Sequence, residues 1–154
     1  MTLAADAVST LTGVAGALQD ARDDWWLIGG AAVALHGLDI GIADVDVLLS
    51  RRDILQVLDK LGVGRVEDTA ITRVRSDIWA RWTALPLSVD VMTGLQVHDG
   101  EHWRRVEPKT REVVVVEGRK LYVPSRSELI EILRLFGRTK DLERAKGLEQ
   151  LGRA

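Results

Sequence analysis

Two aspartates, Asp44 and Asp46, stand two residues apart in the mostly apolar segment 43–49, which reads ADVDVLL. We expect this segment to form a β-strand, on which both side chains point to the same face. Neighbouring carboxylates repel each other unless a positive group lies between them. A divalent cation suits this position because hard cations bind carboxylate oxygens. The alternative is a pair of exposed acids on an edge strand.

Gly29 and Gly30 follow a short apolar segment upstream of the two aspartates. We expect them to open a short helix over residues 31–36. The first backbone N–H groups of a helix have no partner inside it and can bind an anion such as phosphate. A phosphate site beside a metal-binding carboxylate pair indicates phosphoryl or nucleotidyl transfer. A plain strand-to-helix turn, which also favours glycine, is the alternative.

Asp90 is a lone acid within a second apolar segment, residues 87–92, which reads LSVDVM. A buried carboxylate is costly without a partner. If this segment is a strand next to the Asp44/Asp46 strand, three carboxylates converge. Three carboxylates suffice to hold two divalent ions roughly 4 Å apart. An ion pair between Asp90 and a nearby arginine is the alternative.

The composition fits one soluble domain with a core. The chain has 154 residues, of which 46% are hydrophobic, and a formal net charge of −2. This charge does not favour tight non-specific binding to nucleic acid. Cysteine is absent, which excludes disulfides and thiolate chemistry. No apolar run has membrane-spanning length and no secretion signal is recognisable, so we expect a cytoplasmic protein that does not contact a membrane.

The elements that must position these residues alternate between helices and strands. We expect an α/β (α+β) fold, with a mixed sheet and helices on its faces, in a single domain over residues 1–154. Its core would span about 25–123 and its C-terminal helices about 125–152. The expected helices cover residues 3–21, 31–36, 51–61, 126–136 and 140–151. The expected strands cover residues 25–28, 43–49, 87–92, 111–116 and 120–123, the last two forming a hairpin.

Two stretches and several caps are less regular. Residues 70–83 read either as one strand or as two joined by a turn near Ser76, and residues 93–109 read as loop. Ser50 and Thr139 are expected to cap helices, and the Ser125–Glu128 pattern predicts a capping box. His36 is expected to have a structural role at a helix end.

The pattern resembles the nucleotidyltransferase superfamily that includes DNA polymerase β, and in particular its small bacterial members. The residues that carry the resemblance are Ile28-Gly29-Gly30, Asp44-Val45-Asp46 and Val89-Asp90-Val91. The segment 29–37, GGAAVALHG, is similar to a GGxAxxxHG opening, and the segment 137–142, GRTKDL, is similar to a GRxKDL segment. Many relatives carry Arg and then Thr or Ser just before the first aspartate, whereas this chain has Ile40-Gly41-Ile42-Ala43.

The resemblance implies an enzyme that moves a nucleoside monophosphate from an NTP to an acceptor hydroxyl and releases pyrophosphate. Asp44, Asp46 and Asp90 would be catalytic and would bind Mg²⁺ in a two-metal site. Gly29, Gly30 and Lys140 would bind the nucleotide, with Lys140 reaching the triphosphate unless it pairs with Asp141 or Glu143. The acceptor could be a small molecule such as an antibiotic, a tRNA or a protein. A partner protein or a second copy would complete the site, since the chain is short.

Other functions remain open at this point. A non-catalytic, antitoxin-like interaction module with the same fold is the main alternative, and the altered residues before Asp44 favour it. A metal-dependent phosphohydrolase is a third possibility, but such sites usually recruit histidines. Three arginines, Arg73, Arg75 and Arg81, could face a phosphate-bearing substrate or only solvent. Trp79 and Trp82 could stack on a base or an acceptor, or could cover the sheet.

Overall fold

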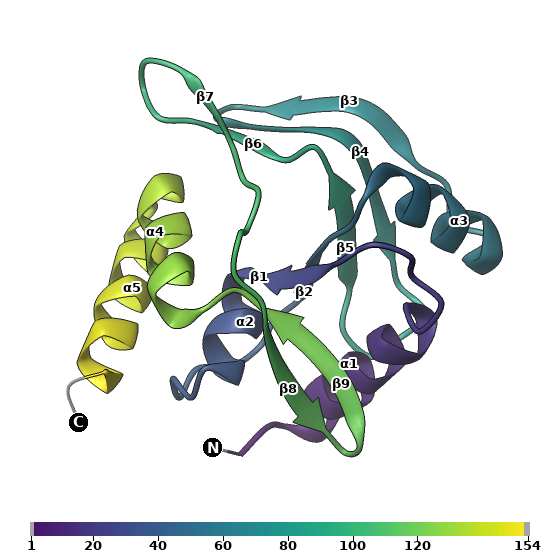
Figure 1. Cartoon of the computed structure of the whole chain (residues 1–154), viewed down its shortest axis with the longest axis horizontal. Coiled ribbons are helices and arrows are strands. Elements are labelled where there is room, and N and C mark those ends of the chain that lie inside the picture. The colour runs from purple at the N-terminus through teal and green to yellow at the C-terminus, as the bar shows by residue number, and fades with distance from the viewer. Residues whose placement is uncertain (1, 153–154) are drawn as a thin grey trace.

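The structure is a computed structural model that describes residues 2–152, and these form a mixed sheet, a separate hairpin and five helices (Figure 1). The helices are α1 (Ala5–Ala17), α2 (Gly29–Leu35), α3 (Arg51–Leu61), α4 (Arg126–Phe136) and α5 (Thr139–Leu151). The strands are β1 (Trp26–Ile28), β2 (Val45–Leu48), β3 (Val66–Ile71), β4 (Val74–Trp82), β5 (Val89–Thr93), β6 (Gln96–His98), β7 (Trp103–Arg105), β8 (Glu112–Val116) and β9 (Arg119–Val123). The expected α+β class is confirmed.

The main sheet has the order β1-β2-β5-β4-β6-β7, with β3 paired to β4. β2 and β5 are parallel neighbours, and the other pairs are antiparallel. The sheet is therefore mixed, as predicted. β8 and β9 form a separate hairpin, which lies beside α1 in Figure 1. The predicted placement of the two aspartate-bearing segments next to each other is also found, because Asp46 and Asp90 occupy β2 and β5.

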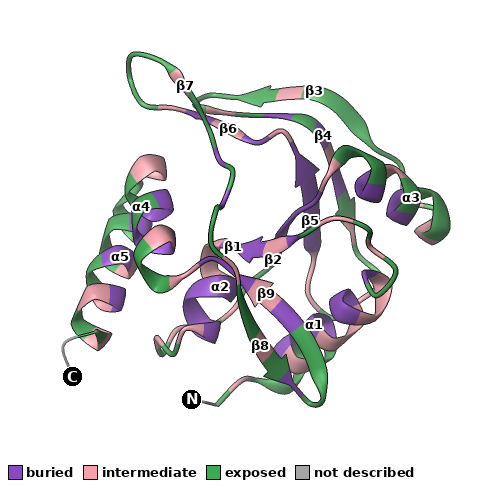
Figure 2. Cartoon of the chain, viewed as in Figure 1, coloured by how far each residue is buried: buried purple, intermediate pink, exposed green. Residues whose placement is uncertain are grey.

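The central strands are buried on both faces, as Figure 2 shows for β5. On one face, Leu27, Val45, Val47, Val89 and Val91 pack into the main hydrophobic core with helices α1 to α5 and the β8–β9 hairpin. On the other face, Ile28, Leu48 and Met92 pack into a smaller core that includes Ile132 of α4. Side chains alternate along a strand, so Asp46 and Asp90 lie on the face of this smaller core.

Helix ends follow the sequence signals in most cases. Ser50 accepts a hydrogen bond from Asp53 N and caps α3, which ends at Gly62 in a left-handed conformation. Ser125 likewise caps α4 through Glu128 N. His36 ends α2, and its ring nitrogen is 2.7 Å from Pro124 O, so its role is structural as predicted. No helix in residues 2–152 is both long enough and apolar enough to span a membrane.

Several boundary predictions were wrong. The first helix is shorter than residues 3–21, and Arg138 rather than Thr139 precedes α5, where the Asp141 carboxylate accepts the Arg138 N–H. The capping box is only half formed. The Glu128 carboxylate accepts hydrogen bonds from Lys109 N and Thr110 N instead of returning to Ser125 N. A long-range partner therefore replaces the local one.

The segments predicted least well are the two that make the outer part of the sheet. A turn at Thr72-Arg73, not near Ser76, joins β3 to β4, and β3 begins before residue 70. Residues 93–109 are not a loop, because they contain β6 and β7. β6 and β7 have three residues each, and β3 is mostly exposed (Figure 2). Such short or exposed strands lack the apolar alternation that marks a buried strand.

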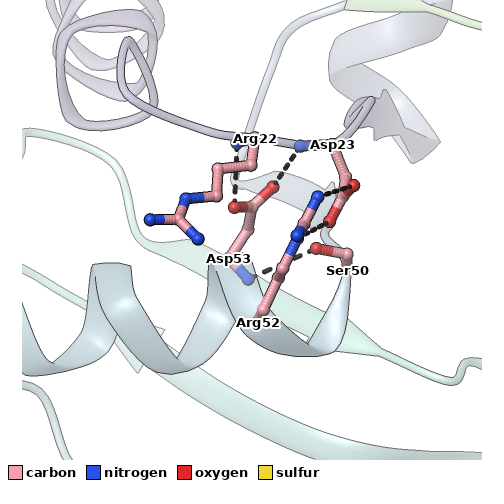
Figure 3. A network of polar contacts seen from close by, with 5 residues as sticks. All are labelled: Arg22, Asp23, Ser50, Arg52 and Asp53. Carbon is pink, nitrogen blue, oxygen red and sulfur yellow. Dashed lines mark hydrogen bonds and ion pairs between the residues drawn. The ribbon is translucent and has the colours of Figure 1, made fainter.

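A network of hydrogen bonds and ion pairs connects the N-terminus of α3 to the segment after α1 (Figure 3). The buried Asp53 carboxylate accepts hydrogen bonds from Arg22 N at 2.9 Å and Asp23 N at 2.8 Å. Asp23 in turn forms two 2.7 Å hydrogen bonds with the Arg52 guanidinium. The Arg52 partner lowers the pKa of Asp23 to about 2. The Asp53, Asp23 and Arg52 side chains are all hydrogen-bonded within the network, so these three side chains hold structure.

Candidate active site

Asp46 and Asp90 are direct register partners in the parallel β2–β5 pair. Neighbouring strands lie ~4.8 Å apart, and partners in register point to the same face. Asp90 is only 7% exposed, whereas Asp46 is half-buried. The two carboxylates therefore stand side by side on one face, as the sequence predicted. They would not meet if Asp90 lay on the other face of the sheet.

Asp44 lies just outside the strand, which begins at Val45 and not at Ala43 as expected. Its side chain is exposed, but its charge still acts on the Asp46 carboxylate. The structure therefore brings Asp44 near the pair from the end of the loop before β2. It does not place Asp44 on the same regular strand.

The electrostatics of Asp46 differ from those of an ordinary surface acid. Burial, followed by the charges of Asp44 and Asp90, raises the pKa of Asp46 to about 7. The positive charges of Arg138 and Lys140 act in the opposite direction. Repulsion among three carboxylates is what a bound cation would relieve. The Lys140 charge thus acts on this site. Of its two alternative partners, Asp141 and Glu143, Asp141 pairs with Arg138.

Gly29 touches the Asp46 carboxylate. Its φ of +66° is a conformation that L-residues rarely adopt. A Cβ at this position would lie 2.8 Å from Asp46 Oδ2, well inside van der Waals contact. The glycine is therefore required twice, by the backbone and by the close approach of the acid. This contact joins the Gly-Gly turn to the aspartate strand, as the sequence predicted.

Gly30 lies close to the guanidinium of Arg144, a residue that the sequence analysis did not single out. A Cβ on Gly30 would lie 3.4 Å from both terminal nitrogens of Arg144, which comes from α5. Arg144 follows Lys140 by one helical turn, so it shares a face of α5 with it. The i, i+4 spacing of Lys140, within the GRTKDL segment, and Arg144, two residues after it, could have indicated this face.

For Arg81 the sequence left open whether the side chain faces a phosphate-bearing substrate or only solvent. Its Nε and one terminal nitrogen lie 2.8 Å and 3.3 Å from the two Asp90 carboxylate oxygens. The two residues are also cross-strand partners on β4 and β5. The ion pair that the sequence offered as the alternative role of Asp90 is therefore present. A metal ion bound by Asp90 would compete with Arg81 for this carboxylate. The Asp90 charge also raises the pKa of Arg81.

The carboxylates suit a hard divalent cation by chemistry and by register. As the side chains stand, residues 2–152 contain no group of three or more histidine, aspartate or glutamate side chains arranged to hold a metal ion. The Arg81–Asp90 ion pair gives a physical reason, since it directs the Asp90 oxygens toward the guanidinium. Asp44, Asp46 and Asp90 as the metal ligands, and Gly29, Gly30 and Lys140 as the nucleotide-binding residues, stay predictions.

The aromatic residues divide between the two faces. Trp82 packs against the main core, which fits the prediction that it covers the sheet. Trp79 lies on the Asp90 face, beside the smaller core, and lines a pocket there. Trp103 belongs to β7, where its ring makes an edge-to-face contact with His98 and lies 4.1 Å from the Arg75 guanidinium carbon. His98 and the other histidines do not join the aspartates.

Comparison with solved structures decides the fold. A candidate nucleotidyltransferase from Thermotoga maritima superposes with a TM-score of 0.74 at 16% identity, over 99% of this chain and 96% of that one. The fold is that of a nucleotidyltransferase. ANT(2″)-Ia in complex with adenylyl-2″-tobramycin gives a TM-score of 0.57 at 15% identity, over 92% of this chain and 86% of its own. Lincomycin-bound LnuA, a lincosamide antibiotic adenylyltransferase, gives 0.53 at 12% identity, over 97% and 98%.

The nucleotidyltransferase fold was therefore anticipated correctly by the resemblance. No protein-family model and no curated protein matches the sequence. The likeness lies in the arrangement of elements rather than in overall sequence. At 12–16% identity the likeness establishes the architecture that carries Gly29, Asp46 and Asp90.

Proposed function

We propose that this protein is a divalent-metal-dependent nucleotidyltransferase that moves the nucleoside monophosphate of an NTP to an acceptor hydroxyl. The observation that carries the proposal is the contact of Gly29 with the Asp46 carboxylate, beside Asp90. Unneutralised carboxylates are costly to the fold, and only glycine leaves room for the Asp46 oxygen at this corner. Their meeting on one face of the sheet is what phosphate and metal binding require. The antibiotic adenylyltransferase neighbours add support at the level of the fold.

In this proposal Asp44, Asp46 and Asp90 would hold Mg²⁺, which when bound would neutralise polyphosphate charge and acidify the acceptor hydroxyl. Gly29 and Gly30 let a polyphosphate approach the backbone closely, because no Cβ intervenes. Lys140 and Arg144 add positive charge from α5. Asp90 would orient the acceptor hydroxyl and take its proton. The acceptor oxygen bonds to the α-phosphorus while the bond to the bridging oxygen breaks, and pyrophosphate leaves with that electron pair.

The direct test compares wild type with Asp46→Ala in Mg²⁺ and ATP radiolabelled at the α-phosphate, in the presence of a cell extract that supplies acceptors. We expect label transfer to fall at least 100-fold, since a group that acts in the transition state is lost. Asp59→Ala is the matched control, because Asp59 is an exposed aspartate on α3, outside the site. Equal transfer by the wild type and Asp46→Ala would refute the proposal.

A second candidate function is supported by the Arg81–Asp90 ion pair, which occupies one of the three carboxylates without any ligand. A protein with this fold could act as an antitoxin-like module that binds a partner protein and transfers nothing. Thermal shift separates the two functions. Stabilisation by Mg²⁺ with one NTP supports the enzyme, whereas stabilisation only by a co-expressed neighbour supports the module.

A further inference from the structure

A pocket of about 570 Å³ adjoins Asp90. In the strand order of the sheet it lies toward β4 and β6, away from β1 and β2. It lies between the β3–β4 hairpin, β6 and the end of α4, and the turn after α4 contributes Arg138. Its volume falls within the range of small-molecule sites. Because β5 lies between β2 and β4, Asp90 stands between this pocket and the Gly29 corner. The pocket is therefore placed to present a hydroxyl to Asp90 from the side opposite the polyphosphate.

The walls of the pocket are mainly apolar. Met92, Leu95 and Val97 are buried members of the smaller core, and Trp79 and Phe136 are partly exposed at its surface. Ile71, at the end of β3, is 73% exposed and lines the same pocket. Two aromatic rings next to aliphatic side chains favour a flat apolar ligand.

The charged residues that line the pocket are three arginines, Arg73, Arg75 and Arg138, and one acid, Asp90. Arg73 donates to His98 O at 2.9 Å and Arg75 to the Gln96 side-chain oxygen at 2.6 Å, so both have neutral partners. Neither forms an ion pair among the residues that the structure describes. The single acid in the lining, Asp90, already pairs with Arg81. A polycationic ligand would meet uncompensated arginines here, whereas an acidic group would be attracted.

We propose that this pocket binds the acceptor, and that the acceptor is a compact hydroxyl compound with an apolar, aromatic body that is neutral or acidic. This proposal rests on the proposed function for the transfer step, in which the acceptor hydroxyl gives its proton to Asp90 and its oxygen bonds to the α-phosphorus. The charge of the pocket separates this acceptor class from polycations such as tobramycin, the antibiotic in the ANT(2″)-Ia complex.

The sequence offers single-site probes for the test. Phenylalanine and tyrosine each occur once. Phe136 lines the proposed acceptor pocket, whereas Tyr122 lines a separate hollow beside Arg111 and Arg119. Fluorinated phenylalanine therefore reports on the pocket alone, and fluorinated tyrosine reports on a control surface of the same protein. Binding is read by ¹⁹F NMR without nucleotide, so the result does not depend on catalysis.

The probes are 6-hydroxy-2-naphthoate, which is acidic, 2-naphthol, which is neutral, and tobramycin, which is polycationic. We expect both naphthalenes to shift the Phe136 signal and not the Tyr122 signal, with the naphthoate binding about tenfold tighter, and tobramycin to shift neither. The double variant Arg73→Gln/Arg75→Gln should abolish the preference for the naphthoate. Arg119→Gln removes an exposed arginine of the control hollow and should leave that preference unchanged.

Three results would overturn the inference. They are binding of tobramycin in preference to the naphthalenes, equal shifts at Phe136 and Tyr122, and competitive displacement of the naphthoate by ATP, which would assign the pocket to the nucleoside. Failure of the proposed function looks different, because the naphthoate would still shift Phe136 while no label transfer occurred. The Tyr122 signal also serves as a fold control, because it reports whether each variant is folded.

Discussion

Two carboxylates near the same strand, Asp46 within β2 and Asp53 in the first turn of α3, are in opposite situations. Asp53 is 1% exposed and accepts two backbone hydrogen bonds, in the network of Figure 3. Asp46 is more exposed, yet it faces two other acids, and its pKa is raised to about 7. Burial alone therefore does not mark a functional acid. The difference lies in whether the fold itself neutralises the charge.

The same contrast appears in the backbone around each acid. The N–H groups that bind Asp53 belong to Arg22 and Asp23, which are held in place by it. The backbone beside Asp46 is instead shaped around the acid, with Gly29 in a left-handed conformation. Around Asp53, the carboxylate stabilises the backbone. Around Asp46, the backbone conformation leaves room for the carboxylate. The predictions below test this division.

The largest effect is expected at the structural acid. Asp53→Ala leaves two N–H groups without their acceptor and should lower the free energy of unfolding by about 3 kcal/mol. Urea denaturation measures this change. Among molecules that remain folded, the Mg²⁺ affinity should be unchanged. A loss of Mg²⁺ affinity would contradict the division between the two regions.

The opposite sign is expected at the candidate site. Asp46→Asn should stabilise the protein by about 2 kcal/mol at pH 8 in EDTA, less than the full pKa difference implies because the side chain is half-buried. The folded pKa lies above the usual value, so wild-type stability falls as pH rises from about 4 to about 7. The higher stability of Asp46→Asn relative to the wild type should disappear toward pH 4. Thermal melts at each pH, with and without Mg²⁺, measure it.

The neighbouring glycines provide a matched pair. Gly29→Ala should lower the free energy of unfolding by about 2 kcal/mol, because a Cβ meets both an unfavourable φ and the Asp46 carboxylate. Gly30→Ala, whose Cβ would meet only the flexible Arg144 side chain, should change it by less than about 0.5 kcal/mol. Equal effects at both positions would show that the Asp46 contact has no energetic weight.

The smallest effect is expected at the ion pair. Arg81→Gln frees the Asp90 carboxylate, and the affinity for Mg²⁺ measured by calorimetry should rise about fivefold. Stability in EDTA should fall by about 1 kcal/mol, because Asp90 is only 7% exposed and loses its ion-pair partner. Arg104→Gln is the control, because it removes a comparable ion pair with Asp99 on the β7 side. A fall in Mg²⁺ affinity in Arg81→Gln would mean that Arg81 positions Asp90 for the metal.

The features that could be predicted from the sequence are those that local sequence patterns encode. The α3 boundaries, the face on which Asp90 lies and the Gly29–Asp46 convergence follow from helical spacing, strand alternation and turn chemistry. The contributions of Arg81 and Arg144 could not be assigned, because cross-strand register and the docking of α5 bring them to the site. Strands β6 and β7 were missed because they have three residues each and lack an apolar repeat, although they pair with each other as a local hairpin.

The outer position of β3 has a consequence for how the proposed activity could change. β3 pairs only with β4, and its exposed Ile71 contributes to one wall of the pocket beside Asp90. β2 and β5, which carry the proposed metal-binding acids Asp46 and Asp90, lie further inside the sheet. If the pocket binds the acceptor as proposed, mutations on β3 could exchange one acceptor for another without disturbing Asp46 or Asp90, so selection could change substrate choice with little risk to folding.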